Sequence, residues 1–159
     1  MRRIAGLCMA VAVLALAAGC GKKSSTSADS GGGGTSSLEG TYLLVGMEAG
    51  GKQFATEEEL AKEPEGERIF KVTADKMIAT KNGKEDPVTY KLDPSKTPKE
   101  IDLAGKKFDG KDEKMYGIYK LEGDKLTICM VESDKPADRP KEFKTADKGK
   151  SVMMTFKKK

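Results

Sequence analysis

From Leu38 to the end of the chain, apolar and polar residues alternate in short segments separated by turn residues. Val88, Tyr90 and Leu92 alternate with polar neighbours, which is the pattern of a strand buried on one face. Expected strands lie at 38–47, 68–73, 76–80, 88–92, 101–103, 114–121, 125–131 and 151–156. Short strands at this close spacing predict an all-β antiparallel fold, either a barrel or a sandwich.

The most clearly patterned hairpin spans residues 116–131, with Gly123-Asp124 as its two-residue turn. That turn places Leu121 opposite Leu126, and successive pairs then alternate between the two faces of the sheet. The predicted core face carries Tyr119, Leu121, Leu126, Ile128 and Met130. The second face also becomes apolar, at Ile118/Cys129 and Tyr116/Val131. We expect segment 136–148 to cover it, and the alternative is an exposed apolar patch that marks a partner site.

One short α-helix is expected after the first strand. Thr56 followed three residues later by Glu59 has the form of a capping box. The helix should run to about Lys62 and end before Pro64. The acidic residues 57–59 suit the positive end of the helix dipole, so capping explains them better than catalysis does.

The first 37 residues differ in composition from the rest of the chain. Residues 1–19 have a basic start and a short apolar run that ends in small residues, which predicts a secretory signal peptide. Cys20 follows directly, and Ala17-Ala18-Gly19-Cys20 resembles the lipobox of bacterial lipoproteins. Residues 20–37 hold no large apolar residue beyond Cys20 and predict a lipidated Cys and a disordered Gly/Ser tether. The alternative is an ordinary secreted protein.

These features predict where the protein lies. Residues 38–159 form one domain on the extracytoplasmic side of the cell envelope, and palmitate or a similar acyl chain on Cys20 anchors it to a bacterial membrane. The sequence does not distinguish the inner membrane from the outer. Cys129 is the only thiol left for the domain, so no internal disulfide is expected.

Composition excludes several classes of function. The chain has no His, which removes the commonest general base and, with a single Cys in the domain, the usual zinc sites. Lys and Arg number 29 against 25 Asp and Glu, and the signal peptide removes Arg2 and Arg3. The remaining charge is nearly balanced and predicts no nucleic-acid partner. We therefore expect no metal site, no cofactor and no catalytic residues.

Two groups of residues were considered for chemistry. Asp109, Asp112 and Glu113 cluster in a Lys-rich loop, but their spacing misses the calcium-loop pattern. Methionine is enriched in the domain, at positions 47, 77, 115, 130, 153 and 154. Methionines fill irregular core space, and several of them inside a barrel would form a loosely selective apolar pocket. Cys129 is expected to be a small buried hydrophobe.

Four segments carry a resemblance to a known family. They are LEGTY from Leu38, YKLDPSKTPKEIDL at 90–103, GIYKLEGDKLTIC at 117–129 and RPKEF at 139–143. They resemble an uncharacterised domain family that is abundant in planctomycete bacteria and described as lipocalin-like. The resemblance implies an eight-stranded calycin-type meander barrel, in which Tyr42 replaces the Trp of a lipocalin-type Gly-x-Trp opening. It implies no catalytic residues.

The sequence therefore leaves three hypotheses for function. The first is a non-catalytic carrier of a small apolar ligand, held between the core faces of the strands. The second is a filled barrel that binds another envelope protein through its outer surface, near Ile118 and Cys129. The third and most remote is an envelope enzyme that uses carboxylates or lysines.

Overall fold

The computed structural model describes residues 37–106, 110–146 and 149–159. These residues belong to one compact unit. The signal peptide predicted at 1–19, the lipidated Cys20 and the tether before residue 37 lie outside the described residues, as does Asp109. For those parts of the chain, the sequence interpretation stays a prediction.

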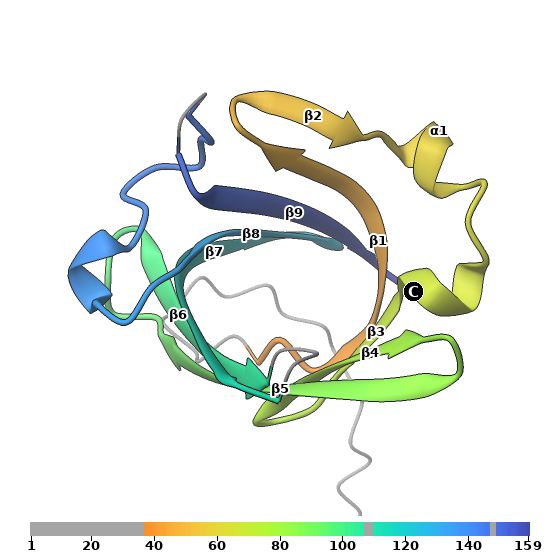
Figure 1. Ribbon diagram of the computed structural model, residues 1–159, viewed down its shortest axis with the longest axis horizontal. Helices are drawn as coiled ribbons and strands as arrows, with labels where there is room; N and C mark the ends of the chain where they lie inside the picture. Colours follow the sequence, from red (N-terminus) through yellow and green to blue (C-terminus); the bar gives the residue numbers. More distant parts are fainter. Residues whose placement is uncertain (1–36, 107–109, 147–148) are drawn as a thin grey trace, which may run out of the picture. The chain divides into compact units, whose positions relative to one another are not determined.

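The described residues form a closed antiparallel β-barrel of eight strands. The sheet follows the chain from β3 to β9, and β9 pairs with β1 to close the barrel (Figure 1). The barrel strands are β1 (Gly40–Ala49), β3 (Ile69–Val72), β4 (Lys76–Lys81), β5 (Lys84–Asp93), β6 (Lys99–Lys106), β7 (Asp112–Glu122), β8 (Lys125–Glu132) and β9 (Ser151–Lys158). The predicted all-β meander barrel is confirmed.

A further strand, β2 (Lys52–Ala55), pairs with the end of β1 and was not expected from the sequence. Gly50 and Gly51 both have positive φ, so β1 runs on to Ala49 and the chain turns tightly into β2. The residues of β2 are exposed or half-buried, and Phe54 is 54% exposed. A strand without a buried face gives no alternating pattern, which is why sequence reasoning missed it.

The predicted helix is present as α1 (Glu57–Leu60) and is shorter than expected. The capping box is confirmed, because the Thr56 amide donates to the Glu59 carboxylate at 2.8 Å and the Glu59 amide donates to the Thr56 hydroxyl at 3.2 Å. The structure also contains two short 3₁₀ turns that the sequence did not predict, η1 (Glu65–Arg68) and η2 (Pro136–Asp138). Both stand next to prolines, where the chain changes direction.

The β7–β8 hairpin has the predicted register at every pair from Tyr116/Val131 to Glu122/Lys125. Tyr119, Leu126 and Ile128 belong to the core, with Leu121 and Met130 packed against it. On the second face, Ile118 and Cys129 are 1% and 0% exposed. The pairing register and both face assignments are thus confirmed.

Residues 136–146, here called the strap, cover that second face. The Cys129 thiol lies 3.7 Å from the Lys144 carbonyl oxygen, and the Lys120 ammonium lies 5.3 Å from the centre of the Phe143 ring. The strap therefore confirms the predicted cover. It also contradicts the alternative of an exposed patch near Ile118 and Cys129.

Candidate functional site

An apolar cavity of about 170 Å³ lies inside the barrel. Its lining comes from seven strands, β3 to β9, so it lies between opposite walls rather than on the outer surface. Sulfur and aromatic groups dominate the lining, which includes Met77, Met115, Met130, Met154, Phe70 and Phe156. The two phenylalanine rings meet edge to face at a centroid distance of 5.0 Å. Four of the six methionines singled out in the sequence thus border one space.

The cavity occupies one end of the barrel interior. Along β5, Asp86 and Val88 line the cavity, whereas Tyr90, the next inward residue, does not. Tyr42, Tyr90 and Tyr119 are buried toward the other end. All three stand at the same end of the barrel, since Tyr42 is near the start of β1 and Tyr90 and Tyr119 are near the ends of β5 and β7. The interior is therefore divided into a filled half and a half that retains space.

Two tyrosines of the filled half are held in their neutral form. The Tyr90 hydroxyl donates to the Thr73 carbonyl oxygen at 2.6 Å. Burial raises the pKa of Tyr42 and of Tyr90, so both phenols stay protonated at neutral pH. The Lys158 ammonium lies 5.8 Å from the centre of the Tyr42 ring and donates to the Glu39 carbonyl oxygen. Tyr42 is fully buried in the core, at the position that the resemblance assigns to a Trp.

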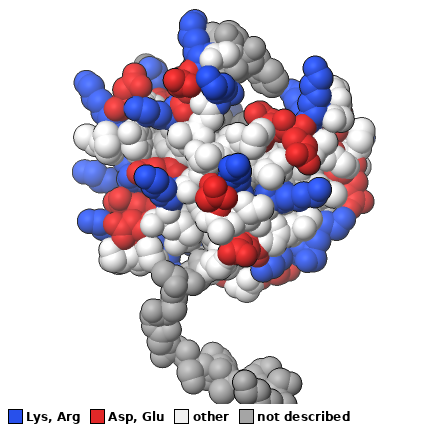
Figure 2. Space-filling model, turned by 90° about the horizontal axis from the view of Figure 1, so that it is seen from below, with Lys and Arg blue, Asp and Glu red and all other residues white. Residues whose placement is uncertain are grey.

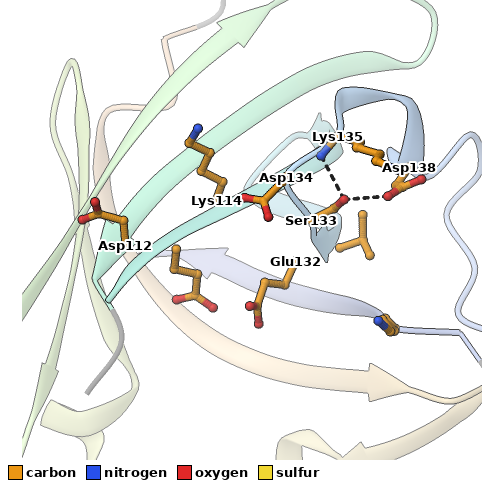
Figure 3. A pocket seen from close by; sticks show the side chains of 10 residues that line it. Asp112, Lys114, Glu132, Ser133, Asp134, Lys135 and Asp138 are labelled. Carbon is orange, nitrogen blue, oxygen red and sulfur yellow. Dashed lines mark hydrogen bonds between the residues drawn. The ribbon is translucent and has the colours of Figure 1, made fainter. Parts of the chain in front are cut away.

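A second, open cleft of about 670 Å³ lies outside the barrel at the ends of β7 and β8 (Figure 3). Its walls mix acidic and basic side chains, among them Asp112, Lys114, Glu132 and Lys135. The Ser133 hydroxyl donates to the Asp138 carboxylate at 2.6 Å and accepts from the Lys135 amide at 3.0 Å. These two hydrogen bonds hold Ser133 within the loop that follows β8.

Two of the carboxylates named in the sequence analysis have clear structural roles. Asp112 pairs with Lys106 at 3.3 Å on an exposed surface. The hydrogen bond from the Thr56 amide is the main cause that lowers the pKa of Glu59, so that carboxylate serves the helix cap. Among the described residues, no three His, Cys, Asp or Glu side chains converge as a metal-binding group.

Cys129 is a buried thiol, as expected. Burial raises its pKa, with the Lys144 backbone acting in the opposite direction and more weakly. It lies beneath the strap on the outer face of β8, on the opposite side of the sheet from the cavity. Cys129 is therefore neither a nucleophile nor part of the candidate site.

On the face drawn in Figure 2, neither positively nor negatively charged side chains gather in one area. Blue Lys and Arg side chains and red Asp and Glu side chains are interspersed there over the white remainder. In the part of the chain that the structure describes, no helix is both long and apolar enough to cross a membrane. The candidate site is the interior cavity of the barrel, which is lined mainly by sulfur and aromatic groups.

The fold and this cavity define the class of the protein, a closed antiparallel β-barrel with an apolar interior pocket. Comparisons with protein-family models, with curated proteins and with solved structures gave no match.

Proposed function

We propose that the protein is a lipid-anchored cell-envelope lipoprotein whose barrel is a non-catalytic binding domain for a small apolar ligand. The observation that carries this proposal is the sulfur- and aromatic-lined cavity inside the barrel. The resemblance to a lipocalin-like family supports it, and the sequence around Cys20 supports the anchor.

The size of the cavity defines the ligand class. A dry cavity of about 150 Å³ lined by apolar side chains binds one benzene ring, and the space here is about 170 Å³. The ligand is therefore a single ring or a short branched chain, well below the usual drug-sized ligand. Methionine sulfurs at ring edges add favourable contacts with an aromatic ligand. A monocyclic aromatic compound fits this lining best.

Filling the cavity should weaken ligand binding. Ala79 lines the cavity on β4, whereas Ala104 on β6 is exposed and faces outward. Ala79→Leu should weaken benzene binding about tenfold or more, because methyl groups forced into a filled site cost about 1–3 kcal/mol. The matched Ala104→Leu variant should bind as the unchanged protein does. Benzene titration of fragment 38–159, followed through its methionine methyl NMR signals, measures both.

Native mass spectrometry of the same fragment, purified from its own host's envelope material, gives an independent result. A reproducible extra mass that disappears on organic extraction supports a carrier and identifies the ligand class. A bare mass together with no benzene binding by the unchanged fragment would contradict the carrier hypothesis.

The anchor has a separate test. Cys20→Ser should remove the acyl mass of the mature protein and its incorporation of labelled palmitate. Cys8→Ser makes the same chemical change within the predicted signal peptide and should leave both unchanged. Mass spectrometry of the purified proteins distinguishes these outcomes, and an unchanged mass for Cys20→Ser would contradict a lipid anchor.

A protein-interaction module is the second candidate, and Phe54 is the observation that favours it. This ring is 54% exposed on β2, a short strand that, among the described residues, pairs with β1 alone. An exposed aromatic group beside a free strand edge is a common feature of partner sites. Under this hypothesis the barrel binds through β2 rather than through the covered face near Cys129.

A further inference from the structure

The methionines of the cavity form a continuous row across neighbouring strands. Met154 on β9 lies opposite Ile128, two residues from Met130 on β8. Met130 in turn lies opposite Gly117, two residues from Met115 on β7. Same-face diagonal neighbours of this kind are about 7–8 Å apart, within reach of long side chains. Three thioethers therefore face one space from three adjacent strands.

A fourth thioether reaches the cavity from the opposite wall. Met77 lies on β4, which is four strands away from β8 in either direction around the closed barrel. Met47 extends the row on β1, since it pairs directly with Met154. Met153 points to the other face of the same strand, because side chains alternate along a strand. The register thus separates the sulfurs that face the cavity from the one that does not.

Thioether sulfur is a soft ligand that selects Cu(I) over hard cations such as Mg²⁺ and Ca²⁺. A cation in an apolar site also needs a nearby negative charge, since burying an unpaired charge is costly. Asp86 is solvent-exposed at the edge of the same cavity and supplies a carboxylate there. Within the described ranges, the Asp86 side chain has no ion pair or hydrogen bond. The cavity therefore combines soft donors with a free counter-charge.

We propose that Met115, Met130 and Met154 bind one soft monovalent metal ion, Cu(I) or its redox-inert analogue Ag(I), in this cavity, with Asp86 balancing its charge. This goes beyond the proposed carrier function and departs from the expectation that the protein has no metal site. That expectation rested on the absence of His and of paired Cys, and it weighed methionine only as apolar lining.

The test titrates Ag(I) into the full-length protein in detergent micelles, with Cys8, Cys20 and Cys129 replaced by Ala in every sample to remove all three thiols. One equivalent should shift the methyl signals of Met115, Met130 and Met154 and leave that of Met153 in place. Replacing the three methionines by Leu keeps the apolar volume but should weaken Ag(I) binding about a hundredfold or more. Met153→Leu is the matched control and should change nothing.

Two further measurements keep the test decisive. Asp86→Asn should weaken Ag(I) binding about tenfold, as loss of supporting groups does at metal sites. X-ray absorption of the Cu(I)-loaded protein should show sulfur neighbours even if the triple variant does not fold. Equal shifts of Met153 and the three cavity methionines, or no sulfur neighbours, would overturn the metal site. Benzene binding is measured separately on the metal-free protein, so failure of the metal site and failure of the carrier function are distinguishable.

Discussion

Gly117→Ala is expected to lower the free energy of unfolding by about 3 kcal/mol or more, at or above the upper end for overpacking a core. A Cβ at this position would lie 2.8 Å from the Cys129 carbonyl oxygen, 2.9 Å from the Met130 Cβ and 3.2 Å from the Ile101 Cγ2. The first two neighbours are held by the β7–β8 pairing, so neither moves without breaking the sheet. Glycine here lets β7 lie close to the Met130 side chain and to the cavity.

Urea unfolding of fragment 38–159, followed by circular dichroism, measures this effect. Gly66→Ala makes the same change at a glycine with nothing within 4 Å of the added atom. Its stability should stay within about 1 kcal/mol of the unchanged fragment. Equal losses for the two variants would show that the tight contacts at Gly117 do not limit packing.

Much of the fold could be predicted because local rules fix it. A two-residue turn at Gly123-Asp124 determines the register of the whole hairpin, and one register alone buries Tyr119 and Ile128 together. Asn82-Gly83 marks the β4–β5 turn in the same way, and both residues adopt positive φ. Where a turn type and an alternating pattern agree, the sequence determines the pairing.

The cavity could be predicted only in part, because its lining is not local. Methionine enrichment suggested a pocket, but Met77 and Met154 meet through barrel closure and not through sequence spacing. Met153 and Met154 are neighbours in the chain, and only the register places Met154 alone at the cavity. No sequence pattern distinguishes Asp86 from the other exposed carboxylates of the chain. Such contacts follow from topology, so composition can suggest them but cannot assign them.

Arg139 belongs to the RPKEF segment, but no pattern in the sequence predicts its contacts. Its guanidinium donates to the carbonyl oxygens of Ile101 and Gly117 at 3.0 and 2.7 Å. It also pairs with the carboxylates of Asp102 at 2.6 Å and Glu100 at 3.3 Å. The side chain is only 13% exposed, so these groups meet in a partly dry environment. One planar group thus fixes the strap to β6 and β7.

Arg139→Ala is expected to lower the free energy of unfolding by about 3 kcal/mol, because it leaves the carbonyl oxygens of the buried residues Ile101 and Gly117 without their donor. It should also loosen the strap over Cys129, so the thiol should react faster with a disulfide reagent. Arg139→Lys should recover only part of the stability, since an ammonium cannot bind all four acceptors in a plane. Urea unfolding and thiol reaction rates of fragment 38–159 measure both effects.

Lys141→Ala is the matched control, because it removes an exposed cation two residues further along the same strap. Surface charges of this kind contribute about 0–1 kcal/mol, so its unfolding curve and thiol reactivity should stay close to those of the unchanged fragment. If Arg139→Ala behaved like Lys141→Ala, packing alone would hold the strap. A selective loss at Arg139 would show that one largely buried guanidinium keeps the second apolar face of the hairpin covered and so closed to a partner.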